Sequence, residues 1–455
     1  MQVDTLIKNG KLVTPDGVFG GTNIGITNGK IAYVGTKGLA IKARETIDAR
    51  GNYVLPGVID AHCHFNPPGQ SFEDCVLKET KAAAFGGVTT AFHFITEGGS
   101  ICERLPYYAE TVKKLATIDM GFQAIVWTQD HLKEMPRCCN AGLTGFKFMM
   151  AYKGGELRAI GIEGPDYAYL YQGMEAAAKV GGVVQVHAEN WELLQLFKAR
   201  NSDKNDFTSY CNGSPPVCEE VDVYAICKMA EATGCNLYIV HVTVGNTLNI
   251  VKEFRDRKTS IFTEISPRYL TIDNKATGLK RPLLAVGSPP MKSRANIGRL
   301  WKGVAAGEID CIATDSGSVS YQNKGVDGGV PWKMFPGWQE MPVSLALMLS
   351  EGVNKKRITL PQVAALMSYN PARVFGIYPK KGAILPGSDA DITIVDLRKK
   401  QKVSADLYTS GCDFTPYEDW GLTGWPILTM VRGKVVMEDG KVKDISGWGR
   451  AANLK

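Results

Sequence analysis

Eight short apolar runs rich in β-branched residues recur through the middle of the chain, and stretches with helical character follow or precede them. The runs cover residues 54–60, 88–92, 121–126, 145–148, 183–186, 237–240, 260–264 and 309–313. Helices are expected at 72–85, 167–180, 219–233 and 296–306. This alternation predicts an α/β fold in which eight strand–helix units close into a (β/α)8, TIM-like barrel. A doubly wound open sheet is the alternative, but it would require a glycine-rich phosphate turn after the first strand, and the sequence has none there.

The two ends of the chain have a different pattern, with short strands separated by turns. At the amino end these strands are expected at 5–8, 10–13, 22–26 and 30–34, and at the carboxyl end at 390–395, 427–431 and 435–437. Asn28-Gly29 is a typical hairpin signal. We therefore predict a small composite β-sandwich domain made of residues 1–54 and 386–455, beside a catalytic barrel of residues 55–385.

Composition excludes several classes of function. The chain has 455 residues and a net charge of +6 that is spread out, without the basic run of a nucleic-acid-binding surface. A small-molecule partner is expected instead. The 11 cysteines are odd in number and include no Cys-x-x-Cys, which favours a reducing cytoplasm over a disulfide framework. No apolar stretch reaches the roughly 18 residues of a membrane span, so a soluble protein is expected.

Metal-ligating side chains fall where the predicted strands end. His62 and His64 lie two residues apart at the end of the first run, and alternate residues of a strand share a face. The fourth, fifth, sixth and eighth runs contain or end at Lys147, His187, His241 and Asp315, respectively. Because the carboxyl ends of barrel strands converge on one mouth, four of the six histidines are predicted to meet there with a carboxylate. The remaining two, His93 and His131, are taken as structural or surface residues.

Lys147 is unusual because it lies in an apolar strand, Gly145-Phe146-Lys147-Phe148. A buried lysine requires a partner or loses its proton. The alternative is a lysine whose ammonium reaches water from the strand end.

In this order and at these spacings, His62-x-His64, Lys147, His187, His241 and Asp315 resemble the cyclic amidohydrolases, which include dihydropyrimidinase, D-hydantoinase, allantoinase and dihydroorotase. The similarity extends over nearly the whole chain, including residues 86–90, 370–376 and 387–391. It implies a metallo-hydrolase barrel with two divalent metal ions, usually Zn²⁺. His62, His64 and Asp315 would hold one ion, His187 and His241 the other. Lys147 would carry a carbamate derived from carbon dioxide (N6-carboxylysine) that bridges both.

The resemblance also implies a reaction. A metal-bridging hydroxide would attack a ring carbonyl, and Asp315 would pass the proton to the departing ring nitrogen, which opens the ring to an N-carbamoyl amino acid. Tyr152 would face the substrate oxyanion, and the backbone of Ser288 would meet the ring imide. A phenol half in water at an interface is the alternative for Tyr152. The family resemblance further implies a homotetramer.

The sequence is compatible with more than one cyclic amide substrate. A hydantoin or dihydropyrimidine ring is the leading expectation, while residues 64–69 resemble allantoinase more closely. Asn66 stands where dihydroorotase typically has an arginine for the substrate carboxylate. Ser316 replaces the usual His after Asp315, and Arg268 replaces the common Gln, so both can reshape the pocket. A non-enzymatic alternative is a structural, partner-binding relative of the collapsin-response type, but such relatives have lost metal ligands. Gly154-Gly155 is expected to begin a flexible insertion beside the mouth.

Overall fold

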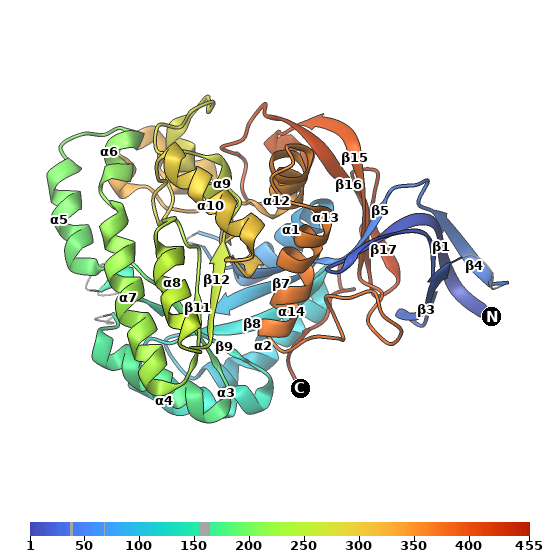
Figure 1. Cartoon of the computed structure of the whole chain (residues 1–455), viewed down its shortest axis with the longest axis horizontal. Helices are drawn as coiled ribbons and strands as arrows, with labels where there is room; N and C mark the ends of the chain where they lie inside the picture. Colours follow the sequence, from blue (N-terminus) through green and yellow to red (C-terminus); the bar gives the residue numbers. More distant parts are fainter. Residues whose placement is uncertain (37–39, 68, 154–163) are drawn as a thin grey trace.

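The computed structural model describes residues 1–36, 40–67, 69–153 and 164–455. Gly154-Gly155 therefore lies outside the described residues. Within the described part of the chain, the strands form two nine-stranded sheets, one closed into a barrel and one built from the chain ends. Figure 1 shows the barrel with its surrounding helices on one side and the terminal sheet on the other.

The barrel strands run parallel in sequence order. They are β6 (Val58–His64), β7 (Val88–Ile95), β8 (Asp119–Ile125), β9 (Gly145–Met149), β10 (Val183–His187), β11 (Asn236–Ile239), β12 (Ile261–Ile265), β13 (Cys311–Ile312) and β14 (Ser316–Gly317). β13 pairs with β12 and β14 pairs with β6, so the two short strands are halves of one interrupted eighth strand that closes the barrel. The predicted barrel is confirmed.

The first apolar run, residues 54–60, was predicted to be one strand, but it forms parts of two. It is divided at Gly57 into β5 (Tyr53–Pro56), which belongs to the terminal sheet, and β6, which belongs to the barrel. The Gly57 N–H donates to Asp391 O at 2.9 Å. A Cβ at Gly57 would lie 2.2 Å from Thr89 Oγ1. The chain therefore crosses from one sheet to the other where only glycine fits.

The helices cover the outside of the barrel and agree with the predicted stretches. Their bounds are α1 (Phe72–Phe85), α2 (Ile101–Leu115), α3 (Gln129–Ala141), α4 (Tyr167–Val180), α5 (Trp191–Asn201), α6 (Phe207–Asn212), α7 (Pro216–Thr233), α8 (Thr247–Asp256), α9 (Arg268–Thr271), α10 (Arg294–Ala306), α11 (Tyr321–Lys324), α12 (Met341–Leu347), α13 (Leu360–Ala364) and α14 (Asn370–Val374). Several begin with a side-chain cap, such as Ser71 on α1 and Asp166 on α4, which satisfies an otherwise unpaired N–H.

The terminal sheet combines both ends of the chain. Its strands are β1 (Gln2–Thr14), β2 (Gly17–Thr27), β3 (Lys30–Thr36), β4 (Lys42–Asp48), β5, β15 (Ile392–Lys402), β16 (Gly421–Val431), β17 (Lys434–Glu438) and β18 (Lys441–Val442). The ends join where β5 pairs with β15 antiparallel, in one continuous mixed sheet. We propose that this sheet is the centre of the small domain formed by residues 1–54 and 386–455, with residues 55–385 as the catalytic barrel.

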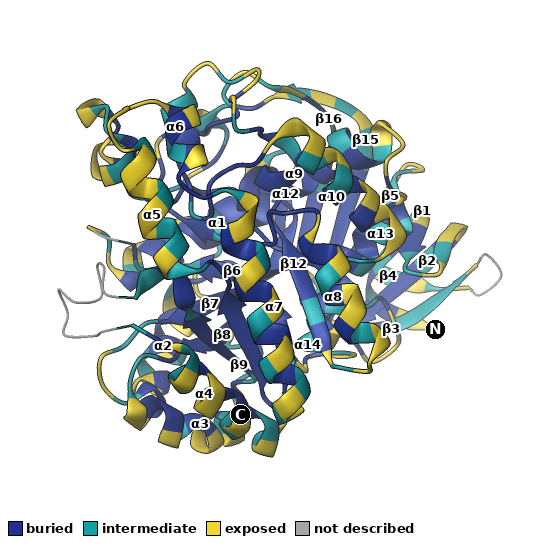
Figure 2. Cartoon of the chain, turned by 60° about the vertical axis from the view of Figure 1, so that its left-hand side comes forward, coloured by how far each residue is buried: buried dark blue, intermediate teal, exposed yellow. Residues whose placement is uncertain are grey.

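Burial follows the layers. Every residue of β7 and β8 is buried, whereas the surrounding helices expose their outer faces (Figure 2). The cysteines are free, and all but Cys139 are buried, as expected of thiols that pack as small hydrophobic groups. Among the described residues, none of the helices combines the length and the apolar character needed to cross a membrane.

Candidate active site

A cavity of about 240 Å³ opens at the carboxyl ends of the barrel strands. Its walls include five of the six predicted metal ligands, together with Tyr152 and Ser288; His62 lies buried beneath it. The lining residues are His64, Asn66, Pro67, Thr96, Ile125, Trp127, Lys147, Met149, Tyr152, His187, His241, Ser288, Asp315, Gly317, Phe335, Pro336 and Gly337. Residues separated by up to 253 positions in the sequence, from 62 to 315, are thus gathered at one site.

His62, His64 and Asp315 form a compact group of donors. Asp315 Oδ1 lies 3.1 Å from His62 Nε2 and 3.3 Å from His64 Nε2. The three ligand atoms lie within 4.8 Å of one another, and imidazole nitrogens with a carboxylate oxygen suit a divalent metal such as zinc. Burial raises the pKa of Asp315, but His62, His64 and Lys147 outweigh it and hold that pKa well below its usual range. The carboxylate is therefore ionised and ready to bind a cation.

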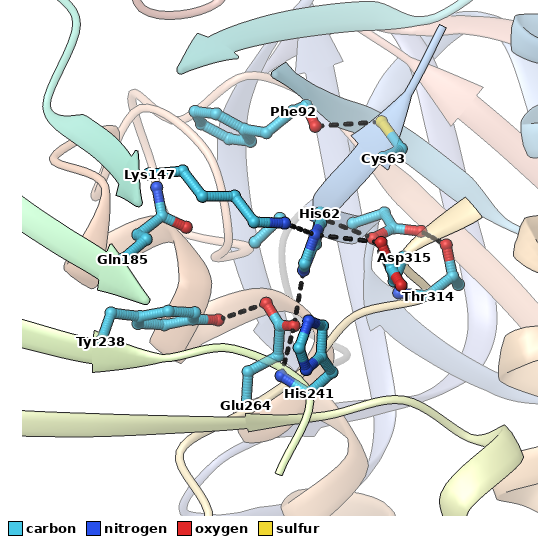
Figure 3. A network of polar contacts seen from close by, with 12 residues as sticks. His62, Cys63, Phe92, Lys147, Gln185, Tyr238, His241, Glu264, Thr314 and Asp315 are labelled. Atoms are coloured by element: carbon cyan, nitrogen blue, oxygen red, sulfur yellow. Dashed lines mark hydrogen bonds and ion pairs between the residues drawn. The ribbon is translucent and has the colours of Figure 1, made fainter. Parts of the chain in front are cut away.

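Lys147 projects from β9 into the same group. Its Nζ lies 2.6 Å from His62 Nε2 (Figure 3). The same atom lies 4.5 Å from the centre of the Phe94 ring. With 1% of its surface exposed, the side chain does not reach bulk water, which argues against the alternative considered above. Burial lowers the pKa of Lys147 to about 8, so an appreciable share of the amine is unprotonated near neutral pH.

His187 and His241 form the second group of donors. Their ring centres are 4.4 Å apart, and the His241 ring lies 5.6 Å from that of His62. Burial, with His187 beside it, lowers the pKa of His241 well below its usual value, which keeps the imidazole neutral as a metal ligand requires. Tyr152 contacts His187, with its ring centre 5.5 Å from that of the imidazole.

Two of these residues have a left-handed backbone. The φ angle is 38° at His241 and 52° at Asp315. For residues other than glycine this conformation costs roughly 1–2 kcal/mol, and it tends to persist where the surroundings enforce it at a functional site. At Asp315 it coincides with the interruption between β13 and β14, which turns the carboxylate toward the histidines.

Glu264 is a site residue that the sequence analysis missed. From β12, its Oε1 accepts hydrogen bonds from His62 Nδ1 at 2.7 Å and from the His241 N–H at 3.1 Å (Figure 3). Its Oε2 accepts one from the Tyr238 hydroxyl at 2.9 Å. A carboxylate on Nδ1 fixes the tautomer of His62 and leaves Nε2 free to face Asp315 and Lys147. The available signal was an acidic residue near the end of a mostly apolar strand.

Glu189 does the same for His187. Its Oε2 lies 2.9 Å from His187 Nε2, and its Oε1 accepts a hydrogen bond from the Ser214 hydroxyl. Lys292 Nζ in turn donates to Ser214 Oγ at 3.0 Å. His187 is therefore held through Nε2, which leaves Nδ1 as the nitrogen that can take a ligand.

The two remaining histidines lie outside the cavity walls. His93 Nδ1 accepts a hydrogen bond from the Phe65 N–H at 3.1 Å, and His131 Nδ1 accepts one from the Trp127 N–H at 3.2 Å. Both side chains are buried and support the backbone of segments that lead to the site.

A barrel of this kind, with histidines, a lysine and an aspartate at its strand ends, defines a class of metal-dependent hydrolase, and comparison with known proteins agrees. The profile described as the amidohydrolase family matches residues 53–436. The chain belongs to the amidohydrolase family.

Individual relatives are similar over nearly their full length. The chain is 32% identical to a D-hydantoinase of Geobacillus stearothermophilus, covering 98% of this chain and 95% of that protein. It is 30% identical to an L-hydantoinase of Paenarthrobacter aurescens, covering 98% and 97%. Among solved structures, L-hydantoinase (dihydropyrimidinase) from Arthrobacter aurescens superposes with a TM-score of 0.92 at 28% identity, covering 99% of this chain and 100% of that one.

Proposed function

We propose that the protein hydrolyses the ring of a cyclic amide of the hydantoin or dihydropyrimidine type and releases an N-carbamoyl amino acid. The observation that carries the proposal is that five of the six predicted ligand residues line one cavity and the sixth, His62, contacts two of them, Asp315 and Lys147. The relatives named hydantoinase and dihydropyrimidinase support the same reaction class and do not favour allantoinase. All six ligand positions carry a residue that can bind metal, which argues against a non-enzymatic relative.

The proposed cofactors are two divalent metal ions, with zinc as the expected ion. His62, His64 and Asp315 would hold one, and His187 and His241 the other, with Lys147 between the two groups. The donor set fits, since its histidines are kept neutral or oriented by carboxylates. The lowered pKa of Lys147 favours the free amine that combines with carbon dioxide, and the resulting carbamate would offer two more oxygen ligands. When bound, the metals would supply an activated water and neutralise charge on a carbonyl oxygen.

The protein's own side chains would move the proton and stabilise charge. Asp315, ionised and facing the cavity, would accept the proton of the attacking water and give it to the departing ring nitrogen. The Tyr152 hydroxyl, at the wall beside His187, would donate a hydrogen bond to the oxygen that becomes anionic. Ser288 would orient the ring through backbone hydrogen bonds to its imide.

The cavity walls favour a ring without an acidic substituent. Among the described lining residues, Lys147 is the only lysine or arginine, and the residue at position 66, where the resemblance to dihydroorotase would imply an arginine for a substrate carboxylate, is an asparagine. Ile125, Trp127 and Phe335 supply an apolar wall for a nonpolar ring substituent. The proposed setting is a cytoplasmic homotetramer.

The test is a hydrolysis panel with the zinc-loaded protein, containing dihydrouracil, hydantoin, a 5-aryl hydantoin, allantoin and dihydroorotate. We expect ring opening of a hydantoin or dihydrouracil, and NMR should detect the N-carbamoyl acid that forms. Preference for allantoin or dihydroorotate would overturn the substrate assignment. Inactivity on all five would overturn the proposed function.

A further inference from the structure

Arg268, in the short helix α9 after β12, is a fully buried cation close to the candidate active site. Its Nε donates to Glu340 Oε2 at 3.1 Å, and its guanidinium carbon lies 3.9 Å from the centre of the Trp338 ring. Glu340 Oε1 accepts a hydrogen bond from the Tyr417 hydroxyl at 2.6 Å. Both charged side chains have no exposed surface. A buried ion pair is costly to desolvate, so stability alone is a weak explanation for this one.

A second nitrogen of the guanidinium binds the segment that interrupts the eighth strand. Arg268 Nη2 donates to Thr314 O at 2.5 Å and to Asp315 O at 3.3 Å. These carbonyls belong to the segment between β13 and β14, where Asp315 has its left-handed backbone. Arg268 therefore supplies donors to carbonyls at the point where the strand is broken.

The same segment is held from its other side. Asp60 accepts hydrogen bonds from the Thr314 N–H at 3.0 Å and from the Thr314 hydroxyl at 2.6 Å. Ser316 Oγ accepts one from the Glu340 N–H at 3.0 Å, which links the segment directly to the partner of Arg268. The sequence departs from the family pattern at Arg268 and Ser316. Both residues bind Glu340, and both adjoin Asp315 in this network.

We propose that Arg268, paired with Glu340, is a positioning residue that sets the direction of the Asp315 carboxylate toward His62 and His64. Arg268 does not line the cavity, so it would act through Asp315 and not on the substrate. Only a planar fork can bind Glu340 with one nitrogen and two carbonyls with another; a lysine ammonium cannot span both. This inference rests on the proposed function, in which Asp315 is a metal ligand.

A purely structural ion pair makes a different prediction. Loss of such a pair would lower the unfolding temperature and leave the metal site of the folded protein unchanged. Loss of a positioning residue would weaken metal binding and alter the ligand field while the protein is still folded.

The test compares Arg268→Lys with the wild-type protein as folded, metal-loaded enzyme. We expect cobalt and zinc affinity, measured by chelator competition, to fall ~10–100-fold, the range typical of residues that orient metal ligands. The Co²⁺ absorption spectrum should change, and kcat should fall while KM stays within about threefold, because no substrate contact is lost.

The matched control is Arg255→Lys. Arg255 is also held by a carboxylate, Asp310, and by a backbone carbonyl, Glu308 O at 3.0 Å, but at the opposite end of the eighth strand. This variant should keep the wild-type cobalt spectrum and metal affinity even if it unfolds at a lower temperature.

A second variant, Arg268→Met with Glu340→Gln, removes both buried charges and so avoids an unpaired carboxylate. It should show the same loss of metal affinity. Wild-type affinity and spectrum in the folded Arg268 variants would overturn the inference. Because the readout is metal binding, failure of the wild-type protein to hydrolyse the substrate panel would instead count against the proposed function.

Discussion

Glu264 offers a sharp test of how the site is held, because it contacts a metal ligand without lining the cavity. The substitution Glu264→Gln keeps the shape of the side chain. The amide oxygen can still accept from His62 Nδ1 and the His241 N–H, and the amide nitrogen can meet the Tyr238 hydroxyl, which rotates to accept. What is lost is the negative charge.

The expected effect follows from that loss. A hydrogen bond to a charged group contributes about 1.5–3 kcal/mol and a neutral one about 0.5–1.5 kcal/mol, so the change is about 1–1.5 kcal/mol. At 1.4 kcal/mol per decade, this corresponds to a metal affinity lower by about 5- to 12-fold. The cause is a less basic His62 imidazole, whose Nε2 faces the metal group.

The assay is competition of the cobalt-loaded protein with a chelator at fixed pH. Tyr238→Phe is the control, since it removes only the contact to Glu264 Oε2 and leaves His62 its charged partner. We expect the control to lose less affinity than Glu264→Gln. Unchanged affinity in Glu264→Gln, or an equal loss in both variants, would refute the assignment of Glu264 to His62.

Three further variants test the chemistry. Lys147→Ala should abolish activity because it removes the amine proposed to carry the bridging carbamate, and short carboxylic acids should restore part of it; full activity without them would contradict the proposed role of Lys147. Asp315→Asn should lower kcat ~10²–10⁴-fold in protein that retains metal, since an amide cannot shuttle the proton; an unchanged kcat would reduce Asp315 to a ligand. Tyr152→Phe should keep its metal and its KM, but on hydantoin its kcat should fall roughly 10²–10³-fold, which corresponds to a loss of ~2.7–4 kcal/mol of transition-state stabilisation. A wild-type kcat would contradict the oxyanion role of Tyr152.

The barrel could be predicted because its signal is repeated along the chain. Each apolar run was expected as one strand, and seven of the eight contain or overlap a single strand, the eighth run only the first half, β13, of the interrupted one. The exception is the run at 54–60, where hydrophobicity alone could not show that Gly57 carries the chain from one sheet to the other. Periodicity reports which residues are buried, and both halves of this run are buried, in different sheets.

The gathering of the histidines was predictable for a related reason. Strand ends of a barrel share one mouth, so position along the sequence was enough to place His187 and His241 near His62. The residues behind them were not predictable. Glu264 and Arg268 act through hydrogen bonds whose partners lie on segments distant in the sequence, and a sequence pattern does not show which neighbour a buried charge faces.

The most direct test of the central claim is to titrate metal-free protein with zinc while following ring opening of its best cyclic amide substrate. The arrangement of five proposed ligands in two groups around Lys147, the sixth, predicts that activity rises to a plateau at about two zinc ions per chain, since the ligands exceed those needed by one tetrahedral ion. Full activity at one ion per chain, or without metal, would contradict the dinuclear site.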